Sequence, residues 1–243
     1  MSASAAARSR SITARSCHRR RSFDGTALDV LFPEPLASVL GDDELPPSRT
    51  SEQTTTKGGR EMGAIRVHEF MSLDGVIDAP TWTFDYGFDP RMGEAIAASM
   101  AGCQGILLGR TTYEMFEPAW SQRTVEDDPG APFFNDTTKY VVSGTLTATT
   151  WRNTHLLGPY DAEAIRSLKS DLEGDLYVSG SGTLVHALLA DGLVDELHLF
   201  VYPLTLGVGP RLFAENDTPR KLSLEASASY DNGVVYLAYR AQG

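Results

Sequence analysis

A strand, a glycine turn and a helix follow one another without a gap in residues 176–197, and this segment constrains the fold more than any other. The apolar run Leu-Tyr-Val stops at Ser-Gly-Ser-Gly-Thr, and apolar residues then recur with helical spacing from Leu184 onward. Because Gly180 and Gly182 carry no Cβ, a ligand can approach the backbone closely there. The first turn of the helix adds unpaired N–H groups and the positive end of its dipole. We expect a phosphate group to bind at this turn.

The simpler interpretation of the same segment is an ordinary strand-to-helix turn with Thr183 as the N-cap. A dinucleotide-binding fingerprint would need a third glycine or an alanine where Val185 stands, and a P-loop would need Gly-Lys followed by Ser or Thr. The segment satisfies neither motif, so on its own it leaves the two interpretations open.

A second turn of this kind follows the short apolar run Ile-Leu-Leu at residues 106–108. Gly109 permits the turn, Thr111 or Thr112 can cap the helix that follows, and Arg110 brings a fixed cation to the helix N-terminus. A cation at that end opposes the helix dipole unless an anion is bound nearby. We therefore expect Arg110 to contact a phosphate, with a surface salt bridge as the alternative.

A third expected strand, residues 139–145, ends in small hydroxyl side chains that include Ser143 and that can hold another phosphate or a ribose. Strand ends often carry Ser, Gly and Thr for the sake of the turn alone. Three successive strands nevertheless finish at Gly109, Ser143 and Ser179. Parallel strands of an α/β sheet gather their carboxyl ends on one edge, where ligands bind. The coincidence predicts one anion-binding edge.

The apolar patterns elsewhere predict an α/β protein. We expect an opening strand at 64–71, a helix at 91–102, a polar loop at 117–136, a helix at 162–172, strands at 175–178 and 196–202, and a hairpin that joins 221–229 to 234–239.

The first 61 residues differ in composition from the rest. Six arginines and no acidic residue occur in residues 1–21, and residues 45–59 are rich in Pro, Ser, Thr and Gly. This composition predicts a disordered extension, with residues 62–243 as the folded domain. A transit peptide has the same Arg- and Ser-rich character, and a true start of translation at Met62 is the third interpretation.

The folded part is strongly acidic, with 24 acidic and 12 basic residues from Met62 onward, and such a body repels nucleic acid. No apolar run approaches the ~20 residues that a membrane span requires. The two cysteines supply neither a disulfide framework nor a metal site, a usage typical of a reducing cytoplasm. We expect a cytoplasmic protein with a small-molecule substrate and with no metal, membrane or nucleic acid as partner.

Asp74 lies in the Ser-Leu-Asp-Gly turn that ends the opening strand. An Asp before Gly usually satisfies backbone groups of the turn, and the functional alternative is a carboxylate that faces a pocket. The loop after it, residues 79–90, carries four aromatic residues. They suit the wall of a pocket for a planar ligand or a subunit interface, and equally a loop that folds its aromatic side chains into the core.

Taken together, these segments resemble the dihydrofolate-reductase-like family and, within it, the C-terminal reductase domain of the bifunctional riboflavin-biosynthesis deaminase-reductase. The matching segments are Ser-Leu-Asp-Gly at 72–75, Leu-Gly-Arg-Thr-Thr-Tyr at 108–113, Val-Ser at 142–143, Gly-Ser-Gly-Thr-Leu at 180–184, Pro203, Gly-Val-Gly at 207–209 and Leu-Phe at 212–213. Their order and spacing agree over residues 64–240. The resemblance implies a three-layer α/β/α fold with a mixed, mostly parallel sheet and a C-terminal antiparallel hairpin.

The resemblance also implies NADPH as the cofactor and a homodimer as the assembly. It places the phosphates near two groups of residues and the adenosine ribose 2′-phosphate near Ser143. The two groups are Gly109, Arg110 and Thr111 at one turn, and Gly180, Ser181, Gly182, Thr183 and Leu184 at the other. The zinc-ligand set of the deaminase half is absent, because two cysteines cannot supply its His/Cys/Cys ligands.

Under this resemblance, a hydride reaches a C=N or C=O carbon of a planar heterocycle or a ribosylamino sugar carbon, while a proton reaches the heteroatom. Asp74 is the expected group that orients the substrate or relays the proton, with Asp78 and Asp85 as alternatives. A folate reductase would carry an acid on the first helix, where Glu94 is the only carboxylate. Dihydrofolate reductase activity and a nucleotide- or flavin-binding protein without turnover are the alternative functions.

Overall fold

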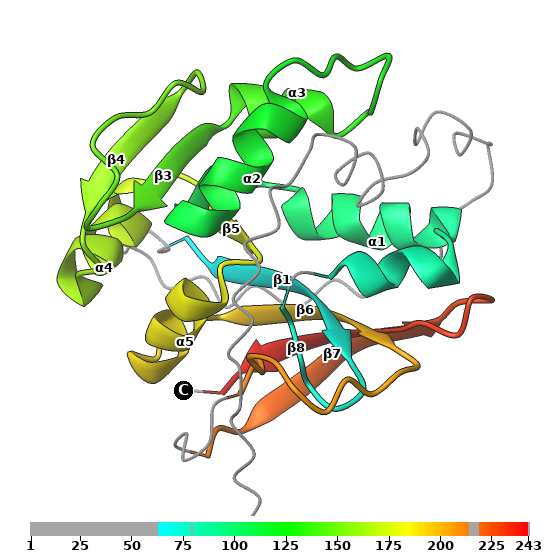
Figure 1. Cartoon of the computed structure of the whole chain (residues 1–243). Helices are drawn as coiled ribbons and strands as arrows, with labels where there is room; N and C mark the ends of the chain where they lie inside the picture. Colours follow the sequence, from blue (N-terminus) through cyan, green and yellow to red (C-terminus); the bar gives the residue numbers. More distant parts are fainter. Residues whose placement is uncertain (1–62, 79, 214–218, 243) are drawn as a thin grey trace, which may run out of the picture.

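The computed structural model describes residues 63–78, 80–213 and 219–242, and in them one eight-stranded sheet carries helices on both faces (Figure 1). The extension expected at residues 1–61 lies outside the described residues. The strands lie in the order β4-β3-β2-β5-β1-β6-β8-β7. Their bounds are β1 Ile65–Ser72, β2 Cys103–Gly109, β3 Thr138–Val142, β4 Thr154–Gly158, β5 Asp175–Ser179, β6 Glu196–Tyr202, β7 Leu222–Ser229 and β8 Val235–Ala241.

The strands β1 to β6 all run parallel, and β8 runs antiparallel to both of its neighbours, β6 and β7. The hairpin between β7 and β8 turns at Asp-Asn-Gly, where Gly233 adopts a φ of 84° that favours glycine. The expected fold class, a mixed and mostly parallel sheet with a C-terminal antiparallel hairpin, is confirmed.

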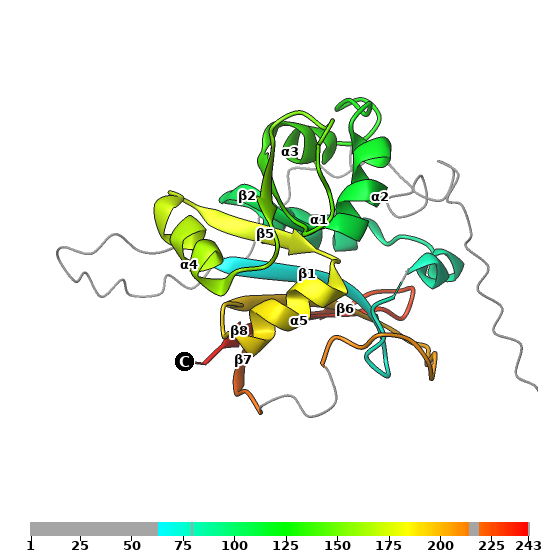
Figure 2. The same ribbon diagram turned by 60° about the vertical axis from the view of Figure 1, so that its left-hand side comes forward.

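The strand β1 lies at the centre of the sheet, between β5 and β6 (Figure 2). Val67 pairs in register with Val178 on one side and with Leu197 on the other, and all three side chains are buried. Because helices cover both faces here, the central strands carry near-continuous apolar runs, as parallel sheets require. The carboxyl ends of β1, β2, β3 and β5 therefore meet along one edge.

Helices form the two outer layers. On one face lie α1 (Pro90–Met100), α2 (Arg110–Trp120) and α3 (Ala131–Asp136), and on the other lie α4 (Ala162–Asp171) and α5 (Gly182–Ala190) (Figure 1). The core on the α4 and α5 face is aliphatic and includes Val185, Leu188 and Leu199. The core on the opposite face is aromatic and includes Trp120 and Phe200. Such division gives the sheet one aliphatic and one aromatic face.

Four elements differ from the expectations drawn from the sequence, and the first is the 3-10 helix η3 (Thr81–Tyr86), which lies in the segment expected to be a loop. The segment expected to be a polar loop begins inside α2, which continues through Pro118 to Trp120, and it ends in the short helix α3. Proline at the first turn of α3 is tolerated because the N–H that it lacks has no partner at that position. The edge strand β4 was not expected, since its side chains are partly exposed and its pattern is weak.

None of the helices in the described ranges is long and apolar enough to span a bilayer.

Candidate functional site

The two glycine turns of the sequence meet at the carboxyl edge of the sheet. The backbone N–H of Gly109 donates a hydrogen bond to the Ser181 hydroxyl over 2.9 Å, and that hydroxyl donates to Thr112 Oγ1 over 2.7 Å. A Cβ on Gly109 would lie 3.3 Å from Ser181 Oγ, so the two turns are packed as closely as glycine permits. The first turns of α2 and α5 therefore lie beside each other.

The caps of these two helices differ from the prediction. The N-caps are Gly109 for α2 and Ser181 for α5, rather than Thr111 or Thr112 and Thr183. Ser181 adopts a left-handed backbone with φ 68°, and its hydroxyl bonds across to the other turn instead of capping its own helix. Neither helix has a side-chain cap, so the amide groups of both first turns stay available to an anion.

The other predicted members of these turns lie where such an anion would bind. Thr111 and Thr183 are exposed in the first turns of α2 and α5. Gly180, with a φ of 62°, and Gly182 flank Ser181. The Leu184 side chain is buried in the aliphatic core, which leaves its backbone as the group that could face a ligand.

Arg110 connects the first turn to the end of β3. Its side chain is 49% exposed, donates to Thr145 Oγ1 over 3.2 Å, and lies 3.8 Å from a Glu114 oxygen. Ser143 accepts hydrogen bonds from the backbone N–H groups of Thr145 and Leu146 and lies 3.5 Å from the Thr145 hydroxyl. The three predicted strand ends thus gather at one edge, with one guanidinium beside them.

Asp74 is held by hydrogen bonds on both of its carboxylate oxygens. It accepts from the Ser72 hydroxyl at 2.7 Å and from the backbone N–H groups of Leu206 and Gly207 at 3.0 and 2.8 Å, while Arg211 lies 3.6 Å away. The Ser72 hydroxyl, followed by the two amide groups, holds the pKa of Asp74 well below its usual range. Asp74 is therefore ionised at neutral pH and ties the end of β1 to the loop at 203–211. Its expected catalytic role stays a prediction.

The other carboxylates considered from the sequence are solvent-exposed. Asp78 and Asp85 lie on the surface after β1, and Glu94 lies on the exposed side of α1. Three of the four aromatic side chains of the 79–90 loop, those of Trp82, Tyr86 and Phe88, pack against the aromatic core, and the rings of Trp82 and Tyr86 lie 5.3 and 5.5 Å from that of Tyr202 in edge-to-face contact. This loop thus contributes to the aromatic core.

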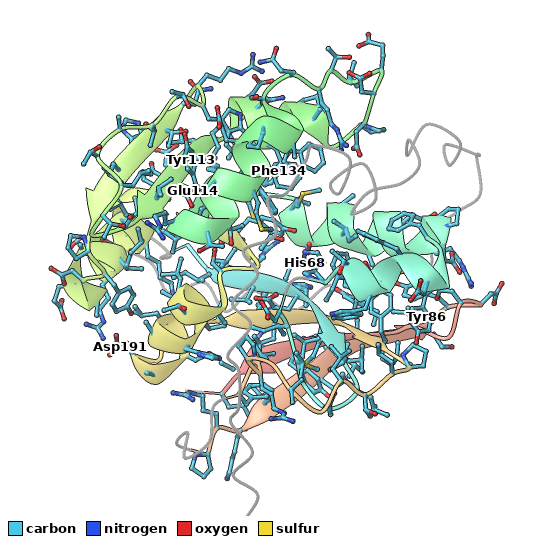
Figure 3. The ribbon with its side chains drawn as sticks, viewed as in Figure 1. His68, Tyr86, Tyr113, Glu114, Phe134 and Asp191 are labelled. Carbon is cyan, nitrogen blue, oxygen red and sulfur yellow. The ribbon has the colours of Figure 1, made fainter. Side chains whose placement is uncertain are left out.

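A buried polar group that the sequence did not reveal lies at the middle of the sheet. His68 on β1 faces the aromatic side, where its Nδ1 lies 2.8 Å from the Tyr177 hydroxyl (Figure 3). Burial, together with the nearby His198, lowers the pKa of His68 to about 3, so its ring is neutral. Its Nε2 has no hydrogen-bond partner among the described residues. A histidine in a strand that also carries charged residues gives no sequence signal of such a position.

Glu69, the next residue on β1, is also buried, with 4% of its surface exposed. One of its carboxyl oxygens has no hydrogen-bond partner in the described part of the chain. Burial raises the pKa of Glu69 to about 8. The sequence pattern missed this residue because charged residues such as Glu69 and Arg66 in a strand are normally solvated.

Similarity to known proteins agrees with this geometry. A family model described as the RibD C-terminal domain matches residues 64–236. The chain belongs to the RibD C-terminal domain family. The match covers the sheet from β1 into β8 and includes the glycine turns, Ser143 and Asp74.

Among relatives of this family member, the uncharacterized protein YyaP of Bacillus subtilis (strain 168) is 26% identical over 184 residues, covering 71% of this chain and 92% of YyaP. A putative riboflavin biosynthesis protein from Shewanella sp. PV-4 has a similar structure, with a TM-score of 0.61, 21% identity, and coverage of 74% of this chain and 99% of that one. Dihydrofolate reductase from Enterococcus faecalis, solved with NADP(H), gives a TM-score of 0.51 at 13% identity, covering 75% and 98%. The fold is therefore dihydrofolate-reductase-like, as expected.

No group of three or more His, Cys, Asp or Glu side chains within the described ranges is arranged to hold a metal ion.

Proposed function

We propose that this protein is an NADPH-dependent reductase of a pterin- or pyrimidine-type substrate, similar to 5-amino-6-(5-phosphoribosylamino)uracil reductase. The observation that carries the proposal is the direct contact between the two turns, in which the Ser181 hydroxyl joins the Gly109 amide to Thr112. Two uncapped helix N-termini fixed side by side offer several backbone donors to a diphosphate. Membership of the RibD C-terminal domain family supports the same activity.

The residues present fit this cofactor. Gly180 and Gly182 let the backbone approach the diphosphate, since nothing but hydrogen extends from their Cα atoms. Arg110 is half-exposed, and the neighbouring Ser143 and Thr145 hydroxyl groups provide short polar contacts beside it. A guanidinium with hydroxyl groups around it suits a ribose 2′-phosphate, which distinguishes NADPH from NADH.

Bound NADPH would supply the hydride, which is two electrons and one proton, and the protein would supply position and charge. The two turns hold the diphosphate and thereby fix the reach of the rest of the cofactor along the sheet edge. Asp74 holds the loop at 203–211 against the end of β1, next to the same edge.

We also propose that the protein forms a homodimer, which light scattering on the full chain tests.

NADPH titration with Arg110→Ala tests the proposal. We expect the wild-type protein to bind NADPH more tightly than NADH, and the variant to lose about 10- to 100-fold in NADPH affinity with little change for NADH. Arg166→Ala is the matched control, because Arg166 is also half-exposed and also pairs with a carboxylate on its own helix, on the opposite face of the sheet. Thermal shift and NADPH fluorescence both report the binding.

Several outcomes would contradict the proposal. Absence of NADPH affinity, together with an Arg110→Ala variant that behaves like the wild type, would exclude an NADPH reductase. NADPH binding without oxidation by dihydrofolate, quinonoid pterins or 5-amino-6-(5-phosphoribosylamino)uracil would favour a binding protein without turnover. A yellow purified protein would indicate flavin instead. Turnover of dihydrofolate alone would favour dihydrofolate reductase activity.

A further inference from the structure

Glu69 faces the α5 side of the central strand. Side chains alternate along β1, and its register with β6 is regular from Arg66 to Ser72. Val67 and Met71, two positions before and after Glu69, both pack in the aliphatic core beneath α5. The Glu69 carboxyl therefore lies on that same aliphatic face, opposite His68.

The backbone that precedes Glu69 contacts the turn that we assign to the cofactor. The carbonyl oxygen of His68, in the peptide group that links it to Glu69, accepts a hydrogen bond of 3.4 Å from the Gly180 backbone N–H. On the other side Glu69 pairs in register with Leu199 of β6. The turn also packs against the segment after β1, since a Cβ on Gly182 would lie 3.2 Å from the Ile77 side chain.

Burial of this carboxyl has no structural compensation in the described residues. Glu69 makes no ion pair or hydrogen bond there, and one of its oxygens is enclosed without a partner. Most buried polar groups in native proteins are hydrogen-bonded, and leaving one unpaired is unfavourable. An unpaired carboxyl at a ligand-binding edge is therefore a candidate for a partner that arrives with the ligand.

The two acids of this edge differ in charge at neutral pH. Burial raises the pKa of Glu69 to about 8, so that its carboxyl carries a proton. The hydrogen bonds of Ser72, Leu206 and Gly207 lower the pKa of Asp74, which has no proton to give. A reduction of a C=N or C=O bond needs a proton, which either water or a positioned acid that is protonated near pH 7 can donate.

We propose that the Glu69 carboxyl is the proton donor of the reduction, an inference that rests on the proposed NADPH-dependent activity. The hydride adds to the carbon of the substrate C=N or C=O bond, and the π electron pair of that bond moves to the heteroatom. The heteroatom takes the proton from the Glu69 O–H, which leaves a Glu69 carboxylate and the oxidised nicotinamide. Solvent then returns the proton to Glu69.

Few other ionisable groups face Glu69. Tyr177 of β5, whose hydroxyl lies with His68 on the opposite face of the sheet, is influenced by the Glu69 charge, and burial raises the pKa of that phenol far above neutral. His186, the only ionisable side chain of α5, contacts the Arg211 carbonyl oxygen. On β6, His198 lies between Tyr236 and Glu196. A titration near pH 8 in this region therefore reports Glu69.

The test combines a direct titration with kinetics of Glu69→Gln, an isosteric change that keeps the volume and removes the acid. In the protein labelled with ¹³C at glutamate carboxyl groups, one resonance is expected to titrate near pH 8 and to be absent from the variant. With 5-amino-6-(5-phosphoribosylamino)uracil as substrate, kcat is expected to fall at least about 100-fold while the Kd for NADPH stays unchanged. The wild-type kcat should decline above pH 8. Glu163→Gln on α4, whose side chain is 81% exposed, is the matched control.

Three results would overturn the inference. These are a Glu69 resonance that titrates in the ordinary range of glutamate, a Gln variant with kcat within threefold of the wild type, and a variant whose NADPH Kd rises while kcat is kept. The last would make Glu69 a cofactor-recognition group. If the wild-type protein neither binds NADPH nor turns over, the proposed function fails, and the proton-donor role fails with it even where the resonance titrates near pH 8.

Discussion

Replacement of Ser181 tests how strongly the two turns depend on each other. In Ser181→Ala the Gly109 N–H loses its acceptor and Thr112 Oγ1 loses its donor. Leaving a partly buried donor unpaired costs about 1–3 kcal/mol, so we expect the free energy of unfolding to fall by about 2 kcal/mol. The left-handed backbone at this residue, with φ 68°, persists in the alanine variant.

Ser181→Gly separates the hydrogen bonds from the backbone. Glycine loses the same hydroxyl but adopts the left-handed conformation without the penalty of roughly 1 kcal/mol that a Cβ brings. The glycine variant is therefore expected to be about 1 kcal/mol more stable than the alanine variant, and less stable than the wild type. Thr112→Val, alone and combined with Ser181→Ala, completes a double-mutant cycle with an expected coupling of about 0.5–1.5 kcal/mol.

Urea unfolding of the full chain at 25 °C, followed by far-ultraviolet circular dichroism, measures these differences. Equal stabilities of the alanine and glycine variants would show that the left-handed backbone at Ser181 carries no strain. An alanine variant within about 0.5 kcal/mol of the wild type would show that the bridge between the turns contributes little, and would remove the main observation behind the proposed cofactor site.

Three further substitutions test the fold. Lys139→Met is expected to lower the free energy of unfolding by about 3 kcal/mol or more in urea titrations, because the buried ammonium donates to three carbonyl oxygens that would lose their partner. Gly105→Ala is expected to lower it by about 1–3 kcal/mol, because a Cβ would lie 2.6 Å from the buried Leu176 side chain, and an unchanged midpoint would contradict that packing. For Asp74→Asn, the lowered pKa of the wild-type carboxyl means that its stabilising contribution is present above pH 3.8 and is lost as the pH falls below that value. The stability difference between wild type and variant should therefore start to shrink below pH 3.8 and continue to shrink in stronger acid, as urea midpoints measured from pH 6 down to pH 2 will show.

The sequence predicted the elements whose pattern is set locally. The strand at residues 196–202 has the predicted bounds, and the glycine turns lie at the predicted strand ends. The edge strand β4 was not predicted, because it pairs with a neighbour on one side only and none of its side chains is fully buried. The helix α3 lies in the segment expected to be a polar loop, because proline is typical of loops, although the first helical turn also accepts it.

The meeting of the strand ends at one edge was predictable, and the contacts between them were not. Gly109, Gly180 and Ser143 mark strand ends because glycine and serine are residue types that favour turns. The bond between Ser181 and Gly109 joins residues 72 positions apart, and local propensity carries no information about it. Glu69 is likewise buried because β6 pairs beside β1 and the aliphatic core packs against that face of the sheet, and neither contact can be read from the local sequence.

The position of β1 also bears on how the chain is made. The first strand of the described residues, β1, has its partners in β5 and β6, more than 100 residues later, as the pairing of Ile65 with Leu176 shows. At about 5–20 residues per second, that strand waits on the order of 5–20 s before its neighbours are synthesised. During this interval an apolar segment that will form the middle of the sheet remains unpaired and open to chaperones. Slower translation of the residues between β1 and β6, or a chaperone that binds nascent residues 64–72, is therefore expected to change the yield of folded protein. The same changes at the edge strands β4 and β7 are expected to have a smaller effect.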